Sequence, residues 1–286
     1  MRSLIHDASV LRLVQIALAE DIGSGDITSE AIIAADWRAR ATLVAKAAGV
    51  VCGLPIAALV FRTVDPETAW EALVEEGQSV EPRTPIAHVY GAARSLLAAE
   101  RTALNFLQRM SGVATLARRY VEAVAGTGAR ILDTRKTIPA WRLLDKYACR
   151  IGGAENHRMG LYDMVLVKDN HIAAAGSIEA ALAAVQPLRE SRQYRVEIEV
   201  QSLEQLDRAL AVGGFDRIML DNFSIDQLRA AVERIGGRYE TEASGGVTLD
   251  TVRAIAETGV ACISVGALTH SAPALDISMD IAIARV

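Results

Sequence analysis

The spacing of hydrophobic and polar positions changes at about residue 112 and divides the chain into two parts. Before this point helical and strand patterns are mixed, which predicts an α+β unit. After it, short apolar runs alternate regularly with amphipathic segments, which predicts a parallel sheet or barrel. The elements expected in the first part are helices over 8–20, 55–61 and 95–110, and strands over 39–52, 64–74 and 86–90.

The second part contains six apolar runs that are strand candidates, fewer than a closed eight-stranded barrel needs. We therefore expect an open, incomplete parallel α/β barrel of about six or seven strands. The domains expected are 1–111 and 112–271, with 272–286 packing back on the first. The expected strands are 130–133, 164–168, 195–200, 217–221, 240–243 and 262–265. The expected helices are 113–125, 140–150, 177–186, 203–212, 225–235 and 248–258.

One face of the expected helix over 95–110 carries Arg101, Asn105 and Gln108 at spacings of four and three. An ordinary solvated helix face would explain this stripe. An anion site or a subunit interface would explain it equally well, because no acidic residue lies on the stripe. Composition does not decide between the two.

Polar and charged groups stand at the carboxyl ends of all six expected strands. In parallel α/β folds these ends converge on one face, where ligands bind. Charged residues are rarely buried unpaired, so a purely structural explanation for all six is weak. In chain order the strand ends carry Arg135-Lys136, Lys168-Asp169, Glu199, Asp221, Ser244-Gly245-Gly246 and, after Ser264, Gly266.

The segment 133–171 is locally basic. It holds seven Arg or Lys residues against five Asp or Glu, in a chain whose formal net charge is −5. Two apolar runs in it are followed by cations, and a His-Arg pair lies in the loop between them. This arrangement indicates a pocket for a small anion with several negative charges. The residues concerned are Arg135, Lys136, His157, Arg158 and Lys168.

The last two strand ends suit a phosphate group. Glycines at Gly245, Gly246 and Gly266 let backbone N–H groups approach an oxyanion, and each turn is followed by an expected helix or helical turn. Phosphate sites after the last two strands recur in α/β barrels.

Glu199 and Asp221 end neighbouring strands. Two facing carboxylates suit Mg²⁺ that is shared with substrate phosphates, but they also suit the stabilisation of a developing cationic carbon. Glu197 shares a face with Glu199 through the two-residue period of a strand, and no separate role for it follows. Asn222 is placed to orient the site.

Composition excludes several other classes. Hydrophobic residues make up 51% and charged residues 23%, the profile of a globular protein. Apolar runs are too short for a membrane span, and we expect no secretory signal. Isolated Cys52, Cys149 and Cys262 predict reduced thiols in a cytoplasmic protein. Without a basic face or tail, we expect no nucleic-acid partner.

Several motifs in order resemble those of the quinolinate phosphoribosyltransferase family. The likeness covers nearly the whole chain, and the block from Gly152 to Ile172 is the most specific part. Ala140-Trp141 departs from the family, which more often has Gly-Leu there. The motifs are EDIGSGDIT, ERTALNFLQRMSG, DTRKTIP, RIGGAENHRMGLYDMVLVKDNHI, EIEV, MLDNF, ASGGV and SVGALTHSAPALD.

The resemblance implies transfer of phosphoribose from 5-phosphoribosyl 1-pyrophosphate to quinolinate, with loss of CO₂. It further implies an amino-terminal α/β sandwich followed by an open barrel, a requirement for Mg²⁺, and a homodimer or larger assembly in which Arg101 completes the neighbouring site. The resemblance implies that quinolinate is bound by Arg101, Arg135, His157, Arg158 and Lys168. For catalysis it implies Lys136, Glu199 and Asp221, the last two also as metal ligands. It implies that phosphate groups are bound by Ser244, Gly245, Gly246, Gly266 and His270.

Three alternatives stay open on the residues alone. The first is a paralogue of the same fold linked to molybdenum transport, which should lack the full ENHR and KDNH motifs found here. The second is a non-catalytic phosphate-binding barrel, which would not need Glu199 and Asp221. The third is an aldolase-type barrel with a Schiff-base lysine, for which Lys168 is the single candidate and its charged neighbours argue against it.

Overall fold

The computed structural model describes residues 4–191 and 193–284. It separates into two compact units. The first comprises residues up to Leu116, together with Ile138–Gly152 and the residues from Ala272 onward. The second comprises Ala117–Thr137 and Gly153–Ser271. Among the described residues, no helix is both long and apolar enough to cross a bilayer.

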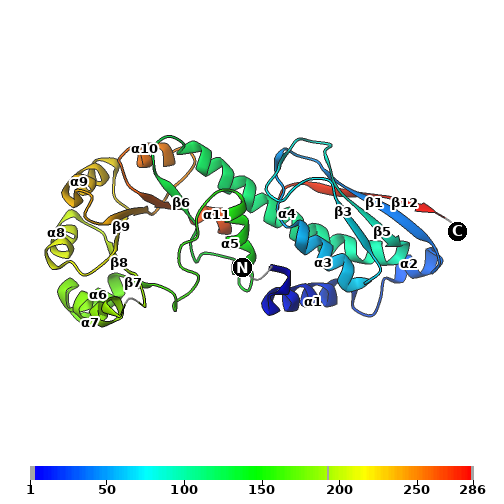
Figure 1. Ribbon diagram of the computed structural model, residues 1–286, viewed down its shortest axis with the longest axis horizontal. Helices are drawn as coiled ribbons and strands as arrows, with labels where there is room; N and C mark the ends of the chain where they lie inside the picture. Colours follow the sequence, from blue (N-terminus) through cyan, green and yellow to red (C-terminus); the bar gives the residue numbers. More distant parts are fainter. Residues whose placement is uncertain (1–3, 192, 285–286) are drawn as a thin grey trace. The chain divides into compact units, whose positions relative to one another are not determined.

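The first unit is built on an antiparallel sheet in the order β12-β1-β5-β3. Alternate residues of β1 turn toward the core, so that Ala41, Leu43 and Ala45 are fully buried. Figure 1 shows α3 lying along this sheet. The strands are β1 (Arg38–Ala45), β3 (Ala69–Ala72), β5 (Pro85–Ala92) and β12 (Ile277–Ala284), with a separate pair β2 (Gly49–Val50) and β4 (Ser79–Val80). The helical elements are η1 (Leu4–His6), α1 (Ala8–Ile22), α2 (Ile27–Ile32) and α3 (Leu54–Val64).

Two expected strands of this unit are shorter than predicted. The expected strand over 39–52 is broken between β1 and β2, and the one over 64–74 shrinks to Ala69–Ala72 because α3 continues to Val64 and a turn follows. The strand β12 pairs along its whole length with β1, from Arg38 opposite Ala284 to Ala45 opposite Ile277. The chain end beyond the barrel therefore adds a strand to the first unit.

A single helix, α4 (Ala93–Ala123), replaces the two helices expected over 95–110 and 113–125. Gly112 suggested a break, but it lies inside this helix. A Cβ atom there would come within 2.0 Å of the Pro273 carbonyl oxygen, so the glycine permits a close backbone approach. The same helix face binds β12, because Gln108 donates its side-chain Nε2 to the Ile277 carbonyl at 2.7 Å.

The helix α5 (Arg142–Ile151) was expected in the barrel domain and instead belongs to the first unit. Trp141 stacks on Phe106 with ring centroids 4.8 Å apart. Arg109 pairs with the buried Asp145 at 3.1 Å. These contacts with α4 hold the segment there. Ala140, just before it, adopts a left-handed φ of 65°, a conformation that costs an L-residue about 1 kcal/mol and that glycine adopts freely.

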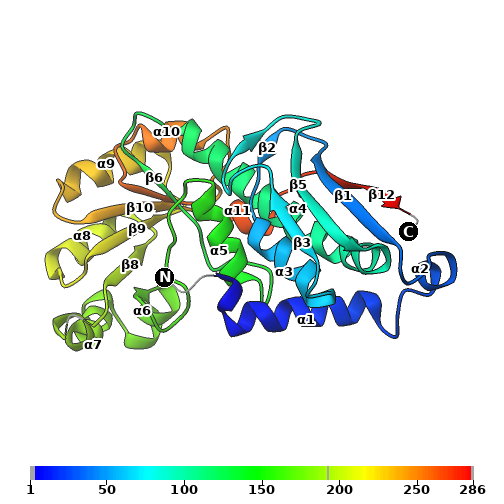
Figure 2. The same cartoon turned by 45° about the vertical axis from the view of Figure 1, so that its right-hand side comes forward.

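The second unit contains the six predicted parallel strands, in the order β6-β11-β10-β9-β8-β7, with β6 and β7 at the two edges. This is the open α/β barrel that was expected. In Figures 1 and 2 the helices α7 to α10 lie outside the strands. The strands are β6 (Arg130–Leu132), β7 (Val165–Val167), β8 (Val196–Val200), β9 (Arg217–Asp221), β10 (Glu240–Ser244) and β11 (Cys262–Ser264).

Serine caps start three of the outer helices soon after a loop. Ser177, Ser202 and Ser224 each accept a backbone N–H of the following turn, which satisfies a donor at the helix start. The short helices α6 and α11 were not predicted, because each has little apolar periodicity of its own. The helices of this unit are α6 (Asp169–Ala175), α7 (Ile178–Glu190), α8 (Leu203–Val212), α9 (Ile225–Ile235), α10 (Val252–Ala256) and α11 (Ala267–His270).

Candidate active site

A cavity of about 710 Å³ lies at the carboxyl ends of the barrel strands. Twelve of the thirteen residues predicted for the site line it. They are Arg135, Lys136, His157, Arg158, Lys168, Glu199, Asp221, Ser244, Gly245, Gly246, Gly266 and His270. The convergence of strand ends therefore holds, while the role of each residue remains a prediction. The thirteenth residue, Arg101, is exposed on α4 in the first unit and is not among the lining residues.

Cations crowd one part of this cavity. Arg135 and Lys136 follow β6, and Lys168 caps the start of α6. Arg158 is held by a hydrogen bond from its Nη1 to the Met164 carbonyl at 3.2 Å. Burial, and then the charge of Arg135, lower the pKa of Arg158, although a guanidinium still remains charged. An anion bound between the two guanidinium groups would offset their mutual repulsion.

The two rim carboxylates have different surroundings. Glu199 is buried and forms an ion pair with Lys168. Asp221 is only half-buried and accepts a hydrogen bond from Asn222 Nδ2 at 2.8 Å. Glu199 lies opposite Met219 in the sheet, so Asp221 stands two residues nearer the strand end on the same side. Lys168 is therefore charge-paired and not a free amine in an apolar strand, which argues against a Schiff-base role.

A glycine turn follows β10. Gly245 has a φ of +98°, and a Cβ atom there would lie 2.1 Å from Asn222 Oδ1. Gly246 has a φ of +60° with open space on its Cβ side. After the neighbouring strand β11, a Cβ atom on Gly266 would lie 3.0 Å from Lys136 Cδ and 3.3 Å from His270 Nε2. These glycines bring backbone, lysine and histidine close enough to surround a phosphate.

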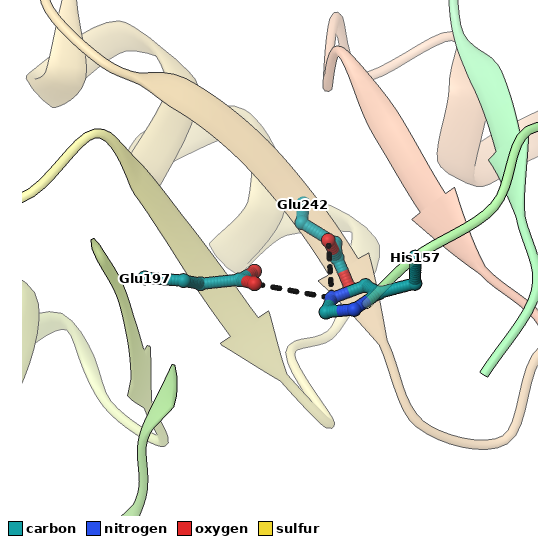
Figure 3. A group of neighbouring side chains, drawn as sticks. All are labelled: His157, Glu197 and Glu242. Atoms are coloured by element: carbon teal, nitrogen blue, oxygen red, sulfur yellow. Dashed lines mark ion pairs between the residues drawn. The ribbon is translucent and has the colours of Figure 1, made fainter. Parts of the chain in front are cut away.

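A cluster of buried charged residues lies beneath the cavity. Of its members, only His157 was predicted as a site residue. Figure 3 shows the carboxyl groups of Glu197 of β8 and Glu242 of β10 pointing at one ring nitrogen of His157. The His157 Nε2 atom is 3.1 Å from a Glu197 oxygen and 3.4 Å from Glu242 Oε2. Arg217 of β9 reaches the same Glu242 oxygen at 3.0 Å. Alternating charged residues in otherwise apolar strands were the only sequence signal for this cluster.

The cluster also has the spacing of a three-ligand metal site, formed by His157, Glu197 and Glu242. The Arg217 guanidinium already supplies positive charge to Glu242, so a further cation there would meet repulsion. Glu240 extends the network at the start of β10. Its carboxylate binds Arg130, Arg195 and Arg217, and although burial opposes ionisation, these contacts lower its pKa to about 2.

Protonation in the cluster follows from its geometry. Burial opposes protonation of His157, but Glu197 and Glu242 outweigh it and raise its pKa to about 9. Burial and the charge of Glu242 raise the pKa of Glu197 to about 7. The pair therefore retains an extra proton at neutral pH. The backbone N–H of Arg158 donates to His157 Nδ1 at 2.7 Å, which requires a lone pair on that atom. The His157 ring therefore carries its single proton on Nε2, and the extra proton of the pair lies on Glu197.

We expect the free energy of unfolding to fall as pH rises from about 6.5 to about 9. A raised folded-state pKa stabilises the fold fully below the unfolded value of 6.5, and this contribution of at most about 3 kcal/mol is lost as pH rises through the folded value near 9. Urea unfolding followed by circular dichroism would measure this fall in stability. Tryptophan fluorescence would not report on the barrel directly, because all three tryptophans lie in the first unit. In His157→Gln the fall should shrink; an unchanged fall would refute this source.

The sequence matches two family models in succession. These are the quinolinate phosphoribosyl transferase N-terminal domain over residues 26–111 and the C-terminal domain over residues 113–280. A tobacco protein named quinolinate phosphoribosyltransferase [decarboxylating] 1b is 45% identical, with 94% of this chain and 81% of that protein covered. A rice protein named nicotinate-nucleotide pyrophosphorylase [carboxylating], chloroplastic, is also 45% identical, with 94% and 76% covered. The crystal structure of NadC from Streptococcus pyogenes superposes with a TM-score of 0.91 at 39% identity, covering 96% of each chain.

Proposed function

Because this chain belongs to the quinolinate phosphoribosyltransferase family, we propose that its cavity binds quinolinate beside 5-phosphoribosyl 1-pyrophosphate and joins them. The activity is that of a decarboxylating quinolinate phosphoribosyltransferase. It yields nicotinate mononucleotide, pyrophosphate and CO₂. The observation that carries the proposal is one cavity with a cationic part, two carboxylates and a glycine-lined part.

Quinolinate fits the cationic part. It carries two adjacent carboxylates, so it needs several cations in fixed positions. Arg135 and Arg158 offer planar forks that match a carboxylate, and Lys168 adds a point charge. His157 lines the same part, but both its ring nitrogens face protein groups. We therefore assign His157 to the support of this part and not to a direct bond with substrate.

The phosphoribosyl donor fits the glycine-lined part. Ser244, Gly245 and Gly246 would hold the 5-phosphate through backbone N–H groups, with Gly266 after the neighbouring strand. Lys136 and His270 lie against Gly266, where they would neutralise the pyrophosphate. This arrangement leaves the anomeric carbon between the two parts, close to the rim carboxylates.

The proposed transfer proceeds by displacement at the anomeric carbon. The quinolinate nitrogen forms the new bond as the bond to pyrophosphate breaks, and Asp221 and Glu199 stabilise the positive charge that develops on the sugar. Lys136 stabilises the departing pyrophosphate. The ring nitrogen is then cationic, so when the 2-carboxylate leaves as CO₂ its electron pair stays on the adjacent carbon until a proton replaces it. We propose that Lys136 and Lys168 assist that step.

The family requirement for Mg²⁺ is compatible with the donor set. Asp221 presents a half-buried carboxylate to the cavity, whereas Glu199 is engaged by Lys168. We propose Asp221 as the principal protein ligand and Glu199 as a ligand only when Lys168 turns to substrate. Mg²⁺ would neutralise pyrophosphate charge when bound, and it usually keeps few protein ligands beside substrate phosphates.

The acceptor tests this proposal directly. Quinolinate should be converted, whereas nicotinate, which lacks the 2-carboxylate, should be a poor acceptor by about 100-fold or more, because the paired cations are left without their anion. Both would be compared at equal concentration by chromatography of nicotinate mononucleotide. Equal conversion of the two acids would contradict the proposal, and so would conversion of neither.

We also propose a homodimer or larger assembly in which Arg101 completes the neighbouring subunit's site. Its exposure on α4 supports this. Arg101→Ala and Glu199→Ala should each be nearly inactive alone. Mixed dimers of the two, purified with two different tags, should regain up to about half of the wild-type activity, because one of the two sites is then intact. Absence of any rescue would show that each site is complete within one chain.

The alternatives are less well supported. The paralogue linked to molybdenum transport is not the activity named for the relatives, and both ENHR and KDNH are intact. A phosphate sensor would not need Glu199 and Asp221 in the same cavity. A cytoplasmic location stays a proposal, supported by three buried free cysteines, although the rice relative is named chloroplastic. No membrane or nucleic-acid partner is proposed.

A further inference from the structure

The buried Glu197 carboxylate needs an explanation. Its side chain is fully buried, and it accepts no aligned hydrogen bond from any residue that the structure describes. One of its oxygens lies 3.1 Å from His157 Nε2, but the two groups are not aligned as a hydrogen bond. A buried carboxylate without aligned donors costs stability, so such groups are usually kept for a function.

Glu242, which also contacts His157 Nε2, is held firmly in place. Its Oε1 accepts the Ser264 hydroxyl from β11, and its Oε2 accepts Arg217 Nη1 from β9 at 3.0 Å. It is also fully buried. Three strands therefore hold Glu242 in place, and its carboxylate and that of Glu197 both contact the Nε2 end of the His157 ring.

The other side of His157 leads to the substrate cations. The His157 backbone N–H donates to Asp133 Oδ1 at 2.9 Å, and its Nδ1 accepts the backbone N–H of Arg158 at 2.7 Å. The Arg158 side chain then lines the cavity beside Arg135. The His157 ring is therefore in direct contact with the Arg158 backbone through Nδ1.

We propose that Glu197 and Glu242 are positioning residues, which clamp the His157 ring through Nε2 so that its Nδ1 holds Arg158 in place for the substrate carboxylate. The inference rests on the proposed function for the identity of that carboxylate. The inference adds Glu197 and Glu242, two buried residues that do not touch substrate, to the residues that support the quinolinate site. It also assigns the cluster to support of Arg158 and not to metal binding.

The first test uses the wild-type protein and needs no substrate. Nitrogen-15 NMR of the histidine side chains at pH 7 is tractable with five histidines, and loss of a signal in His157→Gln assigns the residue. We expect Nε2 to carry a proton and Nδ1 to carry none. A protonated Nδ1, whether or not Nε2 also carries a proton, would overturn the proposal, because Nδ1 could then not accept the Arg158 N–H.

The second test separates positioning from general damage. Glu197→Leu removes the carboxyl group at His157 Nε2. We expect its KM for quinolinate to rise about tenfold or more, while its KM for 5-phosphoribosyl 1-pyrophosphate changes by less than about threefold. Glu197→Gln keeps an oxygen acceptor and should restore the quinolinate KM to within about threefold of wild type. The matched control is Glu179→Leu, which removes an exposed partner of Arg208 in the same unit and should change neither constant.

The outcomes are distinguishable. An unchanged quinolinate KM in folded Glu197→Leu, or an equal rise in both KM values, would refute the positioning role. If Glu197→Leu does not fold, the NMR result on wild type decides. If the wild type itself has no transferase activity, the proposed function fails, and the proton positions on His157 still decide whether the clamp exists.

Discussion

Replacing Arg135 with alanine should reduce kcat/KM for quinolinate by about 10²–10³-fold, because a paired guanidinium–carboxylate contact is lost inside a partly desolvated site. Arg135 is half-buried in the cationic part of the cavity, close enough to Arg158 to lower its pKa. Binding of 5-phosphoribosyl 1-pyrophosphate should survive, since the glycine-lined part is untouched. Calorimetric titration with each substrate in turn would separate the two effects.

Two further variants define this prediction. Arg135→Lys should recover only part of the loss, because an ammonium does not provide the planar fork. The control is Arg229→Ala on the exposed face of α9, where an ion pair with Asp226 is lost, and it should bind both substrates normally. If Arg135→Ala lost both substrates equally, Arg135 would not belong to a separate quinolinate part.

Gly245→Ala should weaken binding of 5-phosphoribosyl 1-pyrophosphate by about 100-fold or more and destabilise the fold by about 1–3 kcal/mol. The new methyl group would lie 2.1 Å from Asn222 Oδ1, so the turn or Asn222 must move. Asn222 itself orients Asp221, and its backbone N–H donates to the Ser244 carbonyl at 2.8 Å. The clash therefore disturbs the phosphate turn and a rim carboxylate together.

A second glycine isolates the effect of the clash. Gly237 has a φ of +73° with nothing within 4 Å of a Cβ atom, so Gly237→Ala tests the backbone strain alone. It should cost about 1 kcal/mol of stability and leave substrate binding unchanged. Urea unfolding and donor titration of both variants give the comparison. Equal donor binding by Gly245→Ala and Gly237→Ala would contradict the assignment of the phosphate turn.

The barrel could be predicted because its strands are short apolar runs buried on both faces, separated by amphipathic helices. In β8 every residue is buried, although two of the five are glutamates. The period of two correctly put Glu197 and Glu199 on one side. Burial depth does not follow from that period, so Glu197 could not be distinguished from a rim carboxylate, and Glu242 and Arg217 were not recognised as its partners.

The first unit was harder to predict because its decisive contacts join residues that are distant in sequence. Gly112 resembled a helix end, but it serves a contact with Pro273. The segment around Asp145 resembled a barrel helix, yet its partners Phe106 and Arg109 lie on α4. Local patterns contain no information about these pairings, whereas the strand-end residues followed from topology alone.

The most direct measurement follows carbon and nucleotide together. Quinolinate labelled with carbon-13 in its 2-carboxylate would be mixed with 5-phosphoribosyl 1-pyrophosphate, Mg²⁺ and the protein. Labelled CO₂ and nicotinate mononucleotide should then appear at equal rates, and neither should form when the phosphoribosyl donor is omitted, because the ring nitrogen becomes an electron sink only after transfer. Release of CO₂ without the donor, or nucleotide that retains the label, would contradict the account.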